Sequence, residues 1–446
     1  MAALALPSAI LLLLPSLALA LPRVSVQRAA PGGAAAFLAG GAPLQLRGLN
    51  YIRLNGTQFV PPATLPVYHS TFSPLFYNAS AVAAAASGAA AAGYNFVRVF
   101  IDPGTPQRSD GVNGPYDSAQ PLSSAYLANF AAFVAAFAAR GLYTLPTLPD
   151  GGPANAHWAA LAGPAPAWCQ YPHCDTMAPG FVAAFAAFAG AFVATLQAEH
   201  GLDPSALLGV SLANEAFLLT SALPFSAAAG LVRTADGGTY DMANASSRQA
   251  CADGNAVSWA AAAAAAVRAA SPGVLVSVGV FTPQAVCKPG FTGVVPVPGC
   301  ADDRYPQRPR ALAQAAPAAL DFLDIHVYPF GHVTGAPGAV GNWSLDADLA
   351  TAEWGQIDRA RAPVLMAETG AFKDFYSSPA DAAAELAELA HRACLRGFQG
   401  VGAWTWDTWE QGARIWTMLD GGGAIRGALA PRRWADLCET PPPRAA

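Results

Sequence analysis

Short apolar runs alternate with longer alanine-rich stretches along most of this chain. Eight of the runs contain aliphatic and aromatic residues without polar alternation, which is typical of strands buried on both faces of a parallel sheet. The predicted strands are Leu44–Asn50, Asn95–Ile101, Leu142–Leu148, Leu207–Leu212, Leu275–Val280, Phe322–Val327, Val364–Ala367 and Gly400–Trp404. A Gly-Gly pair at 40–41 separates two further apolar stretches, so we expect a hairpin that leads into the first of these strands.

The stretches between the strands are rich in alanine, the strongest helix former. The predicted helices are Ala81–Ala92, Ala125–Ala139, Phe181–His200, Ser258–Ala270, Asp346–Ala360 and Pro379–Arg396. Eight strands joined by crossovers long enough for a helix predict an α/β fold, a (β/α)8 TIM barrel. Residues 216–256 and 282–310 are long connections, and we expect them to form loops over the C-terminal face of the strands.

The amino end of the chain resembles a secretory leader. Residues 1–20 are apolar and end in Ala-Leu-Ala, the small-x-small pattern at which signal peptidase cuts. No Lys or Arg lies in this segment, so an uncleaved signal anchor stays open as an alternative. No linker divides residues 21–446, and no later stretch has the composition of a membrane span. We therefore expect a secreted, single-domain monomer that is not held at a membrane once the leader is removed.

Sequons and cysteines are consistent with secretion. Glycosylation sequons occur at Asn55, Asn78, Asn244 and Asn342. Seven cysteines allow up to three disulfides. The short loops that they enclose favour the pairs Cys169–Cys174 and Cys287–Cys300. Zinc binding by Cys169, His173 and Cys174 is the alternative, although this spacing matches no standard ligand pattern.

The charge balance restricts the class of partner. The formal net charge is −5 and only 12% of residues are charged, which excludes the basic surface of a nucleic-acid-binding protein. A neutral polysaccharide imposes no such charge requirement. The composition is therefore compatible with a carbohydrate ligand.

The candidate chemistry lies at the ends of the predicted strands. Glu215 follows the run LLGVSLAN and Glu368 follows APVLMA. An acidic side chain is costly to bury, so at a strand tip it more often faces a cleft than a core. His326 and Tyr328 follow a third run, and alternation along a strand places both rings on the same side. Paired carboxylates with an imidazole and a phenol suit the cleavage of a glycosidic bond.

Other polar and aromatic residues are expected at the same face. Arg98, Asn50 and Trp404 stand at or near strand ends, where barrel enzymes carry their functional groups. Several tryptophans could be either sugar platforms or ordinary packing: Trp158, Trp168, Trp406 and Trp409. Three aspartates could contact hydroxyl groups, and Asp150 is favoured over Asp102 and Asp407.

In their order, the motifs RGLN, NFVRVF, Asn-Glu, HVY, AETG and WTW resemble those of clan A glycoside hydrolases. The resemblance is closest to family 5, the cellulase and mannanase group, and it extends from Arg47 to Ala424. It implies that Glu215 is the general acid/base and Glu368 the nucleophile. It also implies that Arg98 holds the nucleophile and that Asn214 binds the sugar 2-hydroxyl.

The resemblance further implies that His326 and Tyr328 orient the carboxylates and that Trp404 floors the cleavage subsite. Two departures are visible. Asn-Glu-Ala replaces the usual Asn-Glu-Pro, and Asp150 stands where the family has a histidine after the third strand. The second departure leaves the substrate and the subfamily open.

The sequence therefore predicts a secreted retaining β-glycosidase that acts on a β-linked glucan or mannan and needs no metal or organic cofactor. The alternative is a carbohydrate-binding pseudoenzyme with the same barrel, although a binding protein has no need of both glutamates. A barrel hydrolase for another bond would need a Ser/His/Asp set or clustered metal ligands, and the sequence shows neither. For retention, the two carboxyls should lie about 5 to 5.5 Å apart. Glu215 should titrate above Glu368, because each negative charge disfavours the other and Arg98 would stabilise the charge on Glu368.

Overall fold

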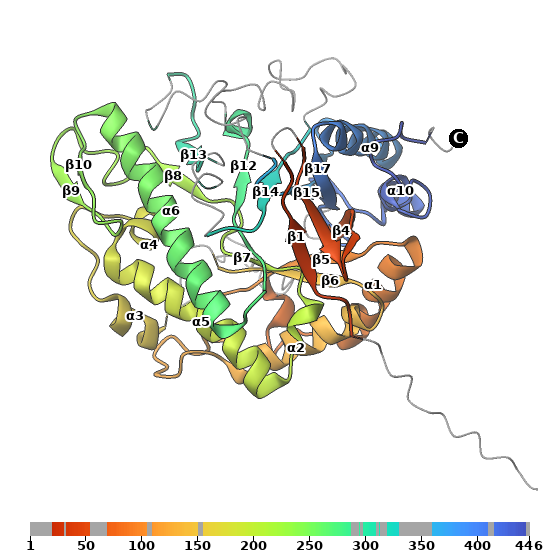
Figure 1. Ribbon diagram of the computed structural model, residues 1–446, viewed down its shortest axis with the longest axis horizontal. Helices are drawn as coiled ribbons and strands as arrows, with labels where there is room; N and C mark the ends of the chain where they lie inside the picture. Colours follow the sequence, from red (N-terminus) through yellow and green to blue (C-terminus); the bar gives the residue numbers. More distant parts are fainter. Residues whose placement is uncertain are drawn as a thin grey trace, which may run out of the picture.

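A parallel barrel forms the centre of the computed structural model (Figure 1). The structure describes residues 20–30, 33–53, 69–104, 109–149, 155–286, 294, 298–308, 312, 319–329, 359–408 and 414–442. The barrel strands are β4 (Leu46–Asn50), β5 (Phe96–Phe100), β6 (Tyr143–Thr147), β7 (Val210–Ser211), β11 (Val276–Ser277), β12 (Gly279–Phe281), β14 (Leu323–His326), β15 (Val364–Thr369) and β17 (Phe398–Ala403). Each lies within or beside one of the eight runs predicted from the sequence.

The two ends of the sheet belong to one strand, and this closes the barrel. The sheet runs in the order β11-β7-β6-β5-β4-β17-β15-β14-β12. Only Val278 separates β11 from β12. The first half of this strand pairs with β7 and the second half with β14, both in parallel. The predicted eight-stranded (β/α)8 barrel is thereby confirmed, with its fifth strand shared between two neighbours in succession.

Helices surround the barrel (Figure 1). They are α1 (Ala79–Ala92), α2 (Ser124–Ala138), α3 (Ala156–Ala162), α4 (His173–Met177), α5 (Pro179–His200), α6 (Ala245–Ala270), α9 (Pro379–Leu395) and α10 (Asp420–Leu429). Most of the helix predicted at Asp346–Ala360 lies outside the described residues. Helix α5 is the one described helix long and apolar enough to span a membrane, but half of its apolar window is buried, and α5 packs on α6 and α3. It is therefore an outer-ring helix of the barrel.

One expectation about the long connections was wrong. Residues 245–256 form the first half of α6 and not a loop. The side chain of Asn244 accepts hydrogen bonds from the backbone N–H groups of Ser246 and Ser247, so it caps the helix well before the alanine-rich part begins. The rest of this connection contains β8 (Phe217–Leu219), which pairs with β13 (Arg304–Pro306) of the other long connection.

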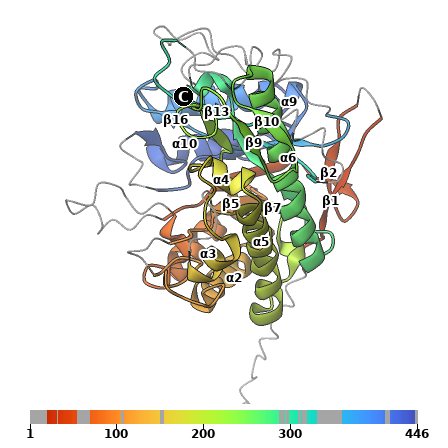
Figure 2. The same ribbon diagram turned by 90° about the vertical axis from the view of Figure 1, so that its left-hand side faces the viewer.

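A hairpin covers the opening of the barrel at the amino ends of its strands. Strand β1 (Val24–Gln27) pairs with β2 (Ala36–Ala39), which turns through Gly40 and Gly41 into β3 (Ala42–Pro43). Both glycines have positive φ, 57° and 84°, which a two-residue turn of this kind requires. The Phe37 ring meets Phe322 edge-on, with 5.2 Å between centroids, in the part of the barrel core nearest the amino ends of the strands. The predicted hairpin is confirmed, and Figure 2 shows β1 and β2 at the edge of the molecule.

The described residues contain one of the predicted local disulfides and a second disulfide that was not predicted. Cys169 is bonded to Cys174, as predicted. This bond rules out the zinc alternative, and His173 is engaged with the backbone O of Leu223 and the backbone N–H of Leu219. A further disulfide joins Cys394 to Cys438, and Cys251 is a buried free thiol. The predicted partner of Cys300, residue 287, lies outside the described residues.

Candidate active site

Glu368 is held from two sides at the carboxyl end of the barrel. Nη1 of Arg98 on β5 donates to Oε2 of Glu368 at 2.6 Å. The hydroxyl of Tyr328 donates to Oε1 at 2.6 Å. Glu368 is 5% exposed and Arg98 is fully buried, so this ion pair is shielded from solvent. Both carboxylate oxygens are thereby fixed in one orientation.

An irregularity in β15 turns Glu368 toward the barrel interior. Strict alternation would place Leu365 and Ala367 inside and Glu368 outside. The pairing of β15 with β17 shifts register between Met366 and Thr369. A bulge of this kind re-aims one side chain, and bulges are common beside active sites. The position of the carboxylate therefore comes from the backbone as well as from Arg98.

Glu215, which follows β7, lies beside His326 at the end of β14, across the end of the fifth barrel strand. Nδ1 of His326 is 3.1 Å from Oε1 of Glu215 and 3.7 Å from Oε2 of Glu368. The imidazole thus stands between the two glutamates. Glu215 is the more accessible of the two, because 25% of its side chain is exposed.

The segment that carries Glu215 is tied to the fifth barrel strand. The backbone N–H of Ala216 donates to the carbonyl of Gly279 at 2.9 Å, and the N–H of Gly279 donates to Ala213 at 3.1 Å. A Cβ at position 279 would come within 1.9 Å of the carbonyl oxygen of Asn214. Only glycine therefore permits this approach. The contact fixes where Asn214 and Glu215 stand.

Asp324 is a member of the site that the sequence analysis missed. Its Oδ2 lies 3.3 Å from Nε2 of His326 and 3.6 Å from Nε of Arg98. Its Oδ1 accepts the backbone N–H of Ala367 at 2.9 Å. Asp324, His326 and Tyr328 share one face of β14 and its extension, so the same alternation that pointed to the two rings could have found it.

The charged groups of the site shift the pKa values of His326 and Glu215. Burial lowers the pKa of His326, but the carboxylates of Glu368 and Asp324 outweigh it and raise this pKa to about 10. Burial raises the pKa of Glu215, but the hydrogen bond and positive charge of His326, aided by Arg304 and Arg98, bring it below its ordinary value. At neutral pH the free protein therefore holds a cationic imidazole beside a charged Glu215.

Asn50 and Asn214 bind the arginine. Nη1 of Arg98 donates to Oδ1 of Asn50 at 3.0 Å, and Nη2 donates to Oδ1 of Asn214 at 2.7 Å. The amide of Asn50 also donates to the carbonyls of Ala367 and Ala403. Asn50 is fully buried, which favours a positioning role over direct contact with a ligand.

Aromatic rings pack beside the glutamates. Trp404 is 7% exposed and meets Phe100 edge-on, with 5.5 Å between centroids. Phe100 also stacks on the ring of His69 at 4.0 Å. Burial and the charge of Arg98 lower the pKa of His69 to about 3, so this imidazole is neutral. Nothing in the sequence around His69 marks it as a neighbour of the site.

The remaining candidates fall into two groups. Trp158 and Trp406 are buried in the main hydrophobic core, so they are packing residues. Asp407 forms an ion pair with Arg53 at 2.5 Å. The sequence predictions for Asp150 and Trp409 lie outside the described residues.

Two clusters have the donors that a metal could use. Oxygens of Glu215 and Glu368 and a ring nitrogen of His326 lie within 4.8 Å of one another. The oxygens of Glu368 already accept from Arg98 and Tyr328, and a guanidinium at 2.6 Å opposes a second cation. The other cluster contains Cys394 and Cys438, whose sulfurs are joined in a disulfide. Neither set of described residues therefore fits a metal.

Comparison with known proteins establishes the fold. No protein-family model and no curated protein sequence matches the chain. Among solved structures, GH5_18 from Bifidobacterium longum subsp. longum ATCC 55813 has a TM-score of 0.53 and 15% identity, over 89% of this chain and 81% of its own. The β-mannanase from the blue mussel Mytilus edulis has a TM-score of 0.51 and 14% identity, over 94% and 98%.

A third match is partial. The chain spans 57% of the exo-β-1,4-mannosidase Op5Man5 from Opitutaceae bacterium strain TAV5, with 20% identity, 88% of this chain and a TM-score of 0.48. At these identities the likeness to the first two structures, whose TM-scores are 0.53 and 0.51, shows the barrel fold alone. The GH5_18 structure is named for the same family that the sequence motifs resemble.

Proposed function

We propose that this protein is a retaining β-glycoside hydrolase of the family 5 type. The observation that carries the proposal is the placement of Glu215 and Glu368, whose nearest oxygens lie within 4.8 Å at the carboxyl ends of the barrel strands. Retaining enzymes place their two carboxyls about 5 to 5.5 Å apart, whereas inverting enzymes need about 6.5 to 9.5 Å to admit a water. The short separation supports double displacement.

In the first step, Glu368 attacks the anomeric carbon as the glycosidic bond breaks, and Glu215 protonates the leaving oxygen. Arg98 and Tyr328 hold the nucleophile oxygens in place. In the second step, Glu215 takes a proton from water, and the resulting hydroxide displaces the sugar from Glu368. Each step forms one bond at the anomeric carbon and breaks one, so two inversions retain the configuration.

The proton for the first step is held by Glu215 and His326 together. In the free protein it resides on His326, whose Nδ1 is 3.1 Å from Glu215. The charge of Glu368 favours that arrangement. As Glu368 forms its bond to carbon it loses this charge, so the imidazole releases its proton toward Glu215 and the leaving oxygen. The two groups act as a coupled pair.

The charge balance and the structural neighbours support one proposal for the substrate class. The chain has a formal net charge of −5 and few charged residues, which suits a neutral polymer. We propose a β-linked glucan or mannan. Mannan is the first to test, because a neighbour that covers 94% of this chain is named a β-mannanase.

A carbohydrate-binding pseudoenzyme is the rival reading. Such a protein would use the aromatic rings of the barrel without turnover. It would have no need of a buried Arg98–Glu368 pair beside a second carboxylate. Those groups favour the enzyme.

We further propose that the protein is secreted and glycosylated. The leader occupies residues 1–20, of which 1–19 lie outside the described residues. Asn78 and Asn244 are exposed sequons, while Asn55 and Asn342 lie outside that part of the chain. The disulfides Cys169–Cys174 and Cys394–Cys438 fit an oxidising compartment. Sequencing the amino end of protein recovered from culture medium tests cleavage, and retention inside cells would contradict it.

Replacement of the nucleophile tests the proposal. Glu368→Ala should abolish hydrolysis of mannan, glucan and aryl β-glycosides, and azide should restore cleavage of an activated aryl glycoside by replacing the missing carboxylate. The matched control is Glu388→Ala, because Glu388 pairs with Arg392 on the surface of α9 and should be dispensable. Full activity of Glu368→Ala would refute the assignment. Binding of these sugars by the wild-type protein without turnover would favour the pseudoenzyme.

Product stereochemistry tests the retaining mechanism separately. Proton NMR during early hydrolysis of a β-linked substrate should show the released reducing sugar as the β-anomer before mutarotation. An initial α-anomer would show that the two glutamates do not act as nucleophile and acid/base.

A further inference from the structure

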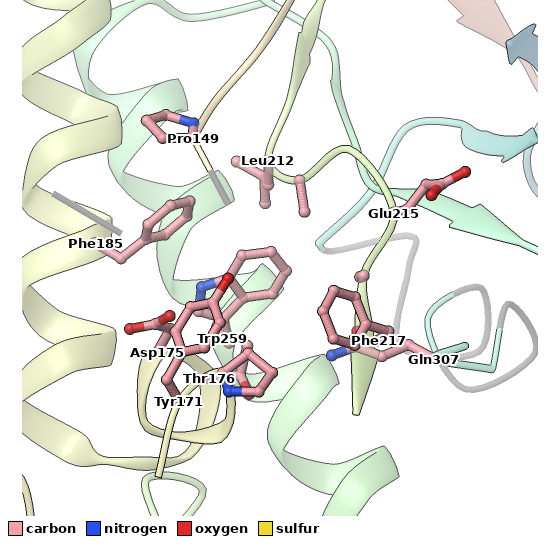
Figure 3. A pocket seen from close by; sticks show the side chains of 13 residues that line it. Pro149, Tyr171, Asp175, Thr176, Phe185, Leu212, Glu215, Phe217, Trp259 and Gln307 are labelled. Carbon is pink, nitrogen blue, oxygen red and sulfur yellow. The ribbon is translucent and has the colours of Figure 1, made fainter. Parts of the chain in front are cut away.

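A two-stranded ribbon beside Glu215 carries an arginine that the proposed chemistry does not use. The ribbon pairs β8 with β13 in antiparallel fashion, and β8 begins two residues after Glu215. The backbone N–H of Gln307, which follows β13, donates to the carbonyl of Ala216 at 2.9 Å (Figure 3). Arg304 is the first residue of β13. Backbone hydrogen bonds therefore fix the strand that carries Arg304 relative to the segment that carries Glu215.

Alternation along the ribbon turns Arg304 away from the outer core. Tyr305 and Leu218 lie opposite each other and are buried in a cluster that includes residues of α4 and α6. Neighbouring side chains of a strand point to opposite faces, so Arg304 lies on the other face of the ribbon. There, 41% of its side chain is exposed.

The guanidinium of Arg304 lies over the ring of Phe281, with 5.3 Å between Cζ and the ring centroid. Phe281 is the last residue of β12, the second half of the fifth barrel strand. Its neighbour Val280 is part of the core between the barrel and the helices, so alternation points Phe281 into the barrel mouth. Phe281 also pairs in register with His326, whose Nδ1 is 3.1 Å from Glu215. Arg304 therefore stands at the mouth of the barrel, on the side of Glu215.

The charges of the site agree with this position. Burial raises the pKa of Glu215, and the hydrogen bond and charge of His326 lower it. The charge of Arg304 lowers this pKa further, and it does so more strongly than the charge of Arg98. In return, after the hydrogen bond to Asp302, the charge of Glu215 helps to raise the pKa of Arg304. Arg304 thus acts on the proposed acid/base, whereas Arg98 is bonded to the proposed nucleophile.

Asp302 fixes the direction of the guanidinium. Nε of Arg304 donates to Oδ1 of Asp302 at 3.0 Å, and Nη2 donates to Oδ2 at 2.7 Å. Oδ1 also accepts the backbone N–H of Arg304 at 3.0 Å. Within the described part of the chain, Nη1 donates to no protein group. Two N–H groups of a pre-oriented guanidinium are therefore available to a ligand.

The position of Arg304 identifies the part of the substrate that it meets. In the proposed mechanism Glu215 protonates the leaving oxygen, so the departing sugar lies on the side of Glu215 and away from Glu368. Hydroxyl groups of that sugar can accept from Nη1 and donate to Asp302. The ion pair of Arg304 and Asp302 has no net charge, which suits a neutral sugar better than an anionic one.

We propose that Arg304 is a specificity-determining residue that binds hydroxyl groups of the leaving-group sugar through Nη1. This role rests on the proposed function and deepens it, because it assigns a residue to the leaving-group side of the site. Arg304 then favours bonds that join two sugars over bonds that join a sugar to an aryl group.

Paired substrates test this role. Mannotetraose and cellotetraose have a sugar as the leaving group, whereas dinitrophenyl β-mannobioside and β-cellobioside have one without hydroxyl groups. For the series that the wild type cleaves, Arg304→Ala should lower kcat/KM on the tetrasaccharide about tenfold. It should leave kcat/KM on the dinitrophenyl glycoside unchanged within about twofold, because this leaving group needs neither the contact nor a proton from Glu215. Arg308→Ala is the matched control, since Arg308 lies on the same connection and pairs with Asp253 of α6.

Arg304→Lys separates the sugar contact from the charge. Lysine keeps a positive charge near Glu215 but lacks the planar fork that Asp302 orients. The pH profile should therefore match that of the wild type, while the loss on the tetrasaccharide should remain severalfold. Full recovery of kcat/KM in Arg304→Lys would show a purely electrostatic role and would overturn the proposal. Equal losses on both substrates by Arg304→Ala, shown to be folded by thermal melting, or no loss on either, would overturn it as well.

Failure of the proposed function would be visible separately. If the wild type cleaves neither class of substrate, hydrolysis is refuted. Calorimetric titration with the two tetrasaccharides then decides the role of Arg304. Binding that is about tenfold weaker in Arg304→Ala than in Arg308→Ala supports the sugar contact, and equal or undetectable binding overturns it.

Discussion

Nε2 of His326 lies 3.3 Å from Oδ2 of Asp324, and neither side chain is exposed to solvent. Asp324 also faces Arg98, so one buried carboxylate borders both cations of the site. The negative charge of Asp324 offsets the cost of burying the Arg98 and His326 cations. It also favours the protonated form of His326, the imidazole between the two glutamates.

Asp324→Asn should lower the pKa of His326 from its value of about 10, because the substitution removes a negative charge that favours the imidazolium. Titration of the His326 ring protons by NMR measures the change directly. If the proposed function is correct, the alkaline limb of the rate profile moves to lower pH as well. An unchanged pKa in a folded variant would show that Glu368 alone sustains the charge.

The raised pKa of His326 predicts a pH dependence of stability. A group whose pKa is higher in the folded than in the unfolded chain stabilises the fold fully below its unfolded pKa, here 6.5, and loses this effect as pH rises through about 10. The wild type should therefore exceed His326→Gln in free energy of unfolding most clearly near pH 6, and the difference should shrink toward pH 10. Urea unfolding at several pH values checks this. A difference that grew with pH would mean that the imidazole is neutral in the fold.

Gly279→Ala should displace the segment of Asn214 and Glu215, because the added Cβ would lie within 1.9 Å of a backbone oxygen. We expect at least a hundredfold loss of kcat from misplacement of about 1 Å, with a smaller effect on global stability. The control is Gly427→Ala on α10, where an added Cβ meets nothing within 4 Å. That variant should gain up to about 1 kcal/mol of stability. Similar effects of the two substitutions would argue against the close approach.

The disulfide between Cys394 and Cys438 should stabilise the fold more than the one between Cys169 and Cys174. The sequence separations are 44 and 5 residues, and loop-closure entropy gives contributions of about 4 and about 2 kcal/mol. Urea unfolding of Cys438→Ser and Cys174→Ser measures both. Equal losses would show that native contacts, and not chain entropy, determine the effect.

The barrel was predictable from the sequence because buried parallel strands leave continuous apolar runs. The same logic located Glu215, Glu368, His326 and Tyr328, since polar residues stand out where such a run ends. It missed Asp324, which is hidden inside a run.

Other features could not be predicted because they depend on contacts distant in sequence. The register shift in β15 arises from pairing with β17, and Cys394 and Cys438 are 44 residues apart. The expectation for Glu215 considered repulsion from Glu368 and the pairing of Arg98 with Glu368, but no partner for Glu215 itself. The ion pair with His326, which lowers the pKa of Glu215, follows from the folded geometry.

Strand β7 is one of the least extensively paired strands of the barrel. It pairs with β11 through two residue pairs and with β6 through one, whereas β5 and β6 share five. Local opening begins where few backbone hydrogen bonds hold an element. Glu215 comes four residues after the end of β7. On heating, we expect amide exchange around residues 210–216 to accelerate before the helices melt. Thermal inactivation should therefore precede the loss of far-ultraviolet circular dichroism, so the working temperature range of the protein is narrower than the range in which it stays folded.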